Sequence, residues 1–86
     1  MKPHEIILYP LMTEQSVYAI ENENKLIFMV DRRANKDDIS RAIRELYGVE
    51  AEKVNTLITK LGGKKAFVRL KEGYDASDLA IRLGIL

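Results

Sequence analysis

The segment Lys53-Val54-Asn55-Thr56-Leu57 predicts a strand with two unlike faces. Successive side chains of a strand point to opposite sides, so Val54 and Thr56 share one side and Asn55 and Leu57 the other. A polar amide contributes little to the stability of a sheet, which makes Asn55 the better candidate for a binding role. Thr56 has two open interpretations, an inward position against the core or a contact with a partner.

A second segment, Ala34-Asn35-Lys36, predicts the start of a helix immediately before this strand. Asn35 is a preferred N-cap residue, and two acidic residues follow in the first turn, where the helix dipole favours negative charge. Apolar residues then recur at helical spacing until Gly48, which favours termination. Capping alone is a sufficient explanation for Asn35, although a contact with a ligand stays open.

The remaining chain predicts a small α+β sandwich with a mainly antiparallel four-stranded sheet and about three helices. The expected order is β-α-β-α-β-β-α, with Lys25–Val30 as a central strand buried on both faces. The other expected elements are a strand at Ile6–Tyr9 closed by Pro10, a helix from Glu14 to about Ile20 capped by Thr13, a turn at Glu21–Asn24, strands Lys53–Thr59 and Lys65–Lys71 around a Gly62-Gly63 turn, and a helix Ala76–Leu83 capped by Asp75.

Alternation assigns two faces to the expected hairpin. The apolar face should lie under the Asn35 helix and comprises Val54, Ile58, Ala66, Val68 and Leu70. The opposite face is mixed and basic and comprises Asn55, Leu57, Thr59, Lys65, Phe67 and Arg69. Phe67 could stack on a nucleobase or be covered by a helix.

Positive charge is concentrated in this hairpin. Five of the fourteen basic residues lie between Lys60 and Lys71, a segment with no acidic residue. The remaining nine basic residues are outnumbered by thirteen acidic ones, so the net charge of +1 hides a cationic lobe on an acidic remainder. This distribution is typical of a protein that contacts a polyanion.

Length and composition narrow the class of protein. The 86 residues predict a single domain, residues 1–86. Without cysteine the chain has neither disulfides nor a thiolate metal site. It has no apolar run long enough for membrane insertion and no signal peptide, so a soluble cytoplasmic protein is expected.

An enzyme is not expected, because no catalytic constellation can be assembled. His4 is the only histidine and lies near the N-terminus, and Asp37 with Asp38 is explained by the helix dipole. Gly62-Gly63-Lys64 lacks the earlier glycine and the following Ser or Thr of a phosphate-binding loop, and both glycines are better explained as turn residues with positive φ. No metal, cofactor or small-molecule substrate is therefore predicted.

Several short motifs occur one after another from about Ile6 to the end of the chain: Thr13-Glu14-Gln15-Ser16, Asn24-Lys25-Leu26, Ala34-Asn35-Lys36, Val54-Asn55-Thr56-Leu57, Lys64-Lys65-Ala66 and Tyr74-Asp75-Ala76-Ser77-Asp78-Leu79. In this order and spacing they resemble the archaeal form of the universal large-subunit ribosomal protein family L-twenty-three. The resemblance implies a protein that binds 23S ribosomal RNA at the rim of the polypeptide exit tunnel. It also implies contact with the neighbouring L-twenty-nine-family protein, the nascent chain and the signal recognition particle.

Candidate RNA-contacting residues on this interpretation are Lys25, Asn35, Lys36, Asn55, Thr56, Lys60, Lys64, Lys65, Phe67 and Arg69. Glu14 and Glu21 are the candidates for docking of protein factors. The chain departs from the family pattern in having Gln15 where a lysine is usual and Thr59-Lys60 where Thr-Pro is usual. Its hairpin is also short, whereas bacterial members carry a long loop there that enters the tunnel.

Two other classes of function stay in view. One is a free-standing interaction module outside the ribosome that uses RNA or the acidic surface of Glu14, Glu21 and Glu23. The other is a small enzyme on a ferredoxin-like scaffold. RNA binding would weaken steeply with added salt, whereas a mainly apolar protein interface would change little.

Overall fold

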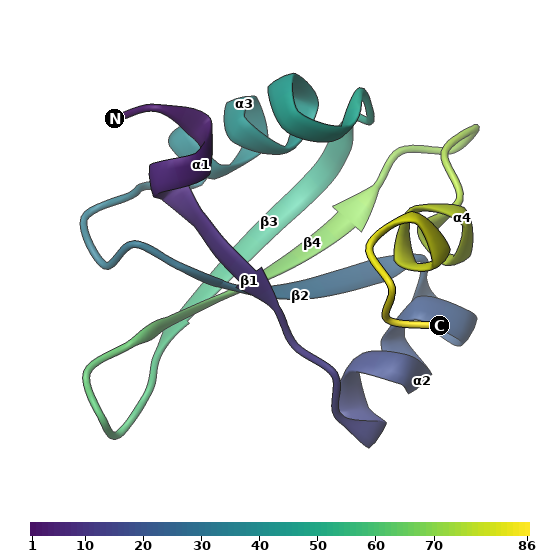
Figure 1. Ribbon diagram of the computed structural model, residues 1–86, viewed down its shortest axis with the longest axis horizontal. Helices are drawn as coiled ribbons and strands as arrows, with labels where there is room; N and C mark the ends of the chain where they lie inside the picture. The colour runs from purple at the N-terminus through teal and green to yellow at the C-terminus, as the bar shows by residue number, and fades with distance from the viewer.

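The computed structural model describes residues 1–86 and contains one four-stranded antiparallel sheet with four helices (Figure 1). The strands are β1 (Ile7–Pro10), β2 (Lys25–Val30), β3 (Ala51–Ile58) and β4 (Lys64–Leu70), in the spatial order β1-β2-β4-β3. The helices are α1 (Pro3–Ile6), α2 (Glu14–Glu23), α3 (Lys36–Tyr47) and α4 (Ala76–Arg82). The predicted α+β class, the antiparallel sheet and the central position of Lys25–Val30 are confirmed.

The register divides the sheet into two faces. Val54 lies opposite Val68, and Val68 lies opposite Leu26, so these three side chains share the face that we call the inner face. Asn55 lies opposite Phe67, and Phe67 lies opposite Ile27, on what we call the outer face. The predicted separation of Val54 from Asn55 is therefore confirmed.

The main hydrophobic cluster lies on the inner face. It joins strand residues such as Phe28 and Val68 to at least one buried residue from every helix: Ile6, Ile20, Ile39, Ala42, Ile43, Ala76, Leu79 and Ala80. Figure 1 shows α1 beside α3 on one side of the fold and α2 with α4 on the other. No outer-face residue belongs to this core cluster.

Helix α3 is placed by both of its ends. Asn35 Oδ1 accepts a hydrogen bond from the Asp38 amide at 2.8 Å, and Asp38 Oδ2 accepts one from the Asn35 amide at 3.0 Å. Gly48 ends the helix in the left-handed conformation with φ 70°. Near that end, the Tyr47 ring stacks on Phe28 of the inner face at 6.1 Å between centroids, and burial raises the Tyr47 pKa. The predicted cap and stop of this helix are confirmed.

Two N-terminal predictions are wrong. The first strand does not begin at Ile6, because Pro3–Ile6 form the short helix α1 and β1 begins only at Ile7. Pro3 stands at the first helical position, where its missing N–H is harmless, and the Glu5 carboxylate accepts a hydrogen bond from the Lys2 amide at 2.8 Å. Helix α2 also runs through the expected turn to Glu23, because the stop residue is Asn24.

Ile58 is a third difference. It lies on the inner face opposite Lys64, as alternation predicts, yet it is 48% exposed. Figure 1 shows the tip of the β3–β4 hairpin extending away from α3, so the helix does not cover this end of the strand. The other boundaries differ by only one or two residues, and none of the helices is long and apolar enough to cross a membrane.

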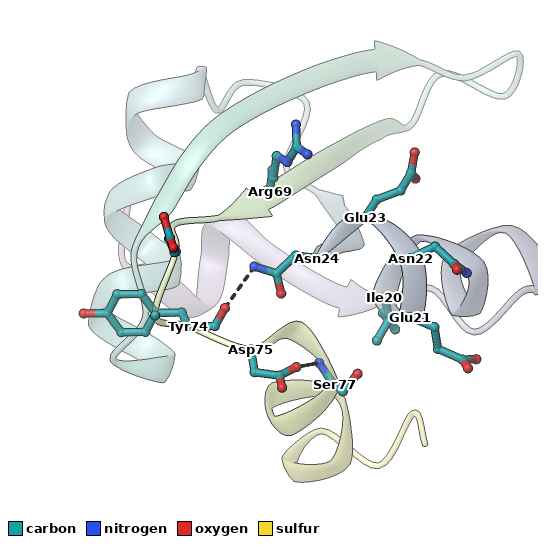
Figure 2. A pocket seen from close by; sticks show the side chains of 11 residues that line it. Ile20, Glu21, Asn22, Glu23, Asn24, Arg69, Tyr74, Asp75 and Ser77 are labelled. Atoms are coloured by element: carbon teal, nitrogen blue, oxygen red, sulfur yellow. Dashed lines mark hydrogen bonds between the residues drawn. The ribbon is translucent and has the colours of Figure 1, made fainter.

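Asn24 connects α2 to the loop before α4. It adopts the left-handed conformation with φ 54°, which asparagine tolerates better than most residues. Its Nδ2 donates to the carbonyls of Tyr74 at 2.9 Å and Leu70 at 3.3 Å, and its Oδ1 accepts from the Ala76 amide at 2.8 Å. Figure 2 shows the bond to Tyr74 at the centre of a surface groove. One side chain thus holds three segments together.

We expect Asn24→Gly to lower the free energy of unfolding by about 1 to 3 kcal/mol, because partly buried hydrogen-bonding groups lose their partners. Glycine keeps the left-handed backbone without strain, so the loss reports the side-chain bonds together with the greater entropy of the unfolded chain. The matched control is Asn22→Gly, which removes one exposed hydrogen bond to the Tyr18 carbonyl. Because position 22 lies inside a helix, glycine there lowers the free energy of unfolding by about 1 kcal/mol through helix propensity. Urea melts measure both. If the Asn24→Gly variant is as stable as the unaltered chain, the Asn24 side chain does not hold the three segments together.

Candidate nucleic-acid interface

The outer face carries three rows of side chains that run across the strands. The first row is Lys25, Arg69 and Lys53, the second is Ile27, Phe67 and Asn55, and the third is Met29, Lys65 and Leu57. Tyr9 of β1 lies opposite Met29 and extends the third row. The face therefore presents cations, an aromatic ring and an amide side by side.

Exposure increases from the middle of this face towards its edges. Ile27 is 3% exposed, Phe67 beside it is half-buried, and Asn55 on the edge strand is exposed. Arg69 and Lys53 are exposed as well, and Leu57 is 54% exposed. Because part of the Phe67 ring is exposed, it can stack on a planar ring while the surrounding polar groups bind the substituents of that ring.

Five of the ten RNA-contact candidates come together on the outer face: Lys25, Asn55, Lys65, Phe67 and Arg69. Thr56 does not join them, because it points to the inner face opposite Ala66 and is half-buried. Of its two open interpretations, the inward one agrees with this position.

Lys64 and Lys65 are neighbours in sequence but lie on opposite faces of β4. Lys65 is opposite Leu57 on the outer face. Lys64 is on the inner face, where its Nζ donates to the Ala34 carbonyl at 2.6 Å. That bond attaches the end of the hairpin to the residue before the α3 cap, so Lys64 has a structural task that Lys65 lacks.

Asn35 and Lys36 lie at the start of α3, away from the outer-face rows. Asn35 is exposed, but its side-chain oxygen is engaged in capping. Lys36 is exposed and lines a shallow pocket of about 180 Å³ at the edge of β3, together with Asp37, Ser40, Ala51, Glu52, Lys53 and Val54. Lys60 is exposed at the hairpin tip.

The hairpin loop is closed by Thr59 and Gly63. The Thr59 amide donates to the Gly63 carbonyl at 2.7 Å, and Thr59 Oγ1 accepts from the Gly63 amide at 3.0 Å. Gly62 has φ 88°, as predicted for a turn glycine. The prediction of positive φ is wrong for Gly63, where a Cβ atom would instead lie 2.8 Å from the Met29 side chain.

The connection after β2 contains one paired and one unpaired arginine. Arg33 donates to both carboxylate oxygens of Asp31, from Nε at 3.0 Å and from the guanidinium end at 3.1 Å. The side-chain and backbone hydrogen bonds from Arg33 lower the pKa of Asp31 from 3.8 to about 2. Arg32 forms no ion pair, and its guanidinium lies 3.8 Å from where a Gly62 Cβ would stand.

The two docking candidates lie on α2, outside the outer-face rows. Glu14 is exposed in the first turn, where it complements the helix dipole, and Thr13 with Ser16 supplies the cap. Glu21 is exposed in the last turn of the helix. It lines the groove of Figure 2, about 610 Å³ in volume, with Ile20, Asn22, Glu23, Asn24, Arg69, Glu72, Gly73, Tyr74, Asp75 and Ser77.

Three side chains with polar groups, on this surface or beside it, were not among the candidates from the sequence. Lys53 stands two positions before Asn55, so the alternation rule applied once more would have found it. Tyr9 joins the face through a β-bulge in β1, and Arg32 approaches the hairpin only through the tertiary fold. Nothing local in the sequence indicates either of these two. No group of three or more His, Cys, Asp or Glu side chains comes together as a metal site.

Comparison with known proteins assigns the class. The model of the family described as Ribosomal protein L23 matches residues 5–77. The chain is also 45% identical to the large ribosomal subunit protein uL23 of Methanococcus aeolicus over 85 residues, which are 99% of each chain. The protein is thus a ribosomal protein, a structural constituent of the ribosome. It belongs to the ribosomal protein L23 family, as its motifs indicated.

Substitutions at neighbouring positions of β3 test the face assignment. We expect Val54→Ala to lower the free energy of unfolding by about 1 to 2 kcal/mol, because it removes two buried methyl groups from the inner face. Asn55→Ala should stay within about 0.5 kcal/mol of the unaltered chain, since Asn55 is exposed and makes no side-chain hydrogen bond within the molecule. Urea denaturation decides, and the reverse order of effects would mean that the register of β3 is wrong.

Proposed function

We propose that this chain is one rRNA-binding domain of the large ribosomal subunit, bound to 23S ribosomal RNA near the polypeptide exit tunnel through its outer face. The observation that carries the proposal is a sheet face whose cations form no ion pairs and which lies outside the core cluster, on a member of the ribosomal protein L23 family. The large-subunit assignment follows the name of the relative from Methanococcus aeolicus. The role is structural rather than catalytic, in the cytoplasm.

The proposed contacts follow from the chemistry of each side chain. Lysine and arginine neutralise phosphates and release counterions, which provides most of the affinity for nucleic acid. Phe67 stacks on an unpaired base, and the Asn55 amide donates to and accepts from a sugar hydroxyl or a base edge. Asn55 and Phe67 lie directly opposite each other, so one nucleotide can engage both. Arg32 and Lys60 extend the cationic surface around the hairpin tip.

The wider setting of the proposal rests on the family. We place the neighbouring L-twenty-nine-family protein, the nascent chain and the signal recognition particle among the partners. The loop from Thr59 to Gly63 is short and closed by its own hydrogen bonds, so a tunnel-intruding role is not part of the proposal. Glu14 and Glu21 on α2 present an acidic surface that would face the incoming factors while the outer face is held against RNA.

We expect Lys65→Gln to weaken binding to 23S RNA and to flatten the slope of log affinity against log salt by about 0.7 to 0.9, the value for one lost phosphate contact. Lys65 is chosen without Lys64, because Lys64 holds the Ala34 carbonyl and its loss would disturb the fold. Filter binding at several salt concentrations measures the slope. Lys71→Gln is the control, since Lys71 lies just beyond the end of β4 and pairs with Glu50 at 3.7 Å. If the affinity of the unaltered chain for 23S RNA does not change with salt, the result would favour a protein-interaction module instead.

Glu14→Arg should leave assembly into the large subunit intact and weaken recruitment of the signal recognition particle. The fold should lose only about 0.3 to 1 kcal/mol from the helix dipole. Co-sedimentation of the particle with variant ribosomes measures recruitment, and Glu45→Arg, an exposed change on α3, is the matched control. If both variants recruit the particle normally, Glu14 serves only the helix.

A further inference from the structure

The first row of the outer face places three cations side by side on three neighbouring strands. Arg69 of β4 lies directly opposite Lys25 of β2 on one side and opposite Lys53 of β3 on the other. Directly opposed side chains on one face have Cβ atoms about 4.5 to 5.5 Å apart, and like charges in such positions repel each other and destabilise the sheet. A row of this kind therefore works against folding unless something anionic lies on it.

The molecule itself does not neutralise this row. Its three ion pairs join Arg33 to Asp31, Arg41 to Asp38 and Lys71 to Glu50. None of them includes a member of the row, although acidic side chains are near. Glu23 and Glu72 line the groove beside Arg69, and Asp37 and Glu52 line the shallow pocket beside Lys53, without forming an ion pair to the row.

The row is also open to an approaching ligand. Arg69 and Lys53 are exposed, Lys25 is half-buried, and no helix packs over them. In Figure 2 the Arg69 side chain projects away from the Asn24 side chain and the loop before α4. A planar guanidinium between two flexible ammonium groups suits phosphate, because arginine binds two phosphate oxygens at once and each lysine adds a point charge.

We propose that Lys25, Arg69 and Lys53 form one phosphate-binding row that holds the RNA backbone, with Lys53 as an essential member. The inference rests on the proposed function and deepens it, since it says which row of the outer face holds a stretch of backbone and which row reads a base. Phe67 and Asn55 occupy the adjacent row, so a backbone seated on the cations directs a neighbouring base towards them. Repulsion within the row is relieved when the RNA is bound.

This arrangement predicts opposite effects of one substitution on folding and on binding. Lys53→Gln and Lys25→Gln should each raise the thermal midpoint of the free protein at low salt, and the gain should disappear at 0.5 M salt, where the charges are screened. Both variants should also bind 23S RNA more weakly. Between 50 and 200 mM salt, each should lose about threefold less affinity than the unaltered chain, as expected for one phosphate contact fewer.

Lys71→Gln is the matched control, because this lysine is exposed beside the end of β4 but is paired with Glu50. This variant should not raise the thermal midpoint of the free protein, and it should not change the salt dependence of RNA binding. If Lys53→Gln and Lys25→Gln bind RNA with the affinity and salt slope of the unaltered chain, the phosphate-binding row is refuted while the proposed function stands. If the unaltered chain shows no salt-dependent binding to 23S RNA, the proposed function itself fails.

Discussion

The alternation of side chains along the strands is the constraint on which this structure depends. All four helices pack on the inner face, and the core cluster contains no outer-face residue. An 86-residue chain can form only one modest core, so using all of its helices on one side leaves the other side of the sheet without a core of its own. That side is the outer face, which carries cations and an aromatic ring that do not contribute to the core cluster.

Side-chain hydrogen bonds, local at the α3 cap and long-range in sequence elsewhere, keep this one-sided arrangement in place. Asn35 and Asp38 cap α3 reciprocally, and the Lys64 ammonium holds the residue before that cap to the end of β4. Asn24 does the same for the opposite end of the sheet by joining α2 to the loop before α4. The outer face can therefore carry repelling charges without losing its geometry, because the hydrogen bonds that position the helices lie elsewhere.

The sequence predicted the parts of the fold that follow from local rules. The period of two placed Asn55, Phe67 and Arg69 on one face, and the Asn35 cap and Gly48 stop bounded α3. Helix α1 was missed because its four residues are too few for an apolar period, and α2 was cut short because an asparagine rather than a glycine adopts the left-handed stop. For the candidate site, charge alone could not show that the adjacent lysines Lys64 and Lys65 have different roles. The different tasks of Lys64 and Lys65 depend on a carbonyl thirty residues away in the sequence.

The central claim, that the outer face is the surface held against RNA, can be tested most directly by lysine acetylation read by mass spectrometry. The reaction would be compared between the free protein and the protein inside intact large subunits. The account predicts that Lys25, Lys53 and Lys65 react in the free protein and are strongly protected in the subunit, while Lys71 beside Glu50 stays comparatively reactive. Lysines of the outer face that react equally in both states, with protection confined to Lys71 or Lys2, would contradict it.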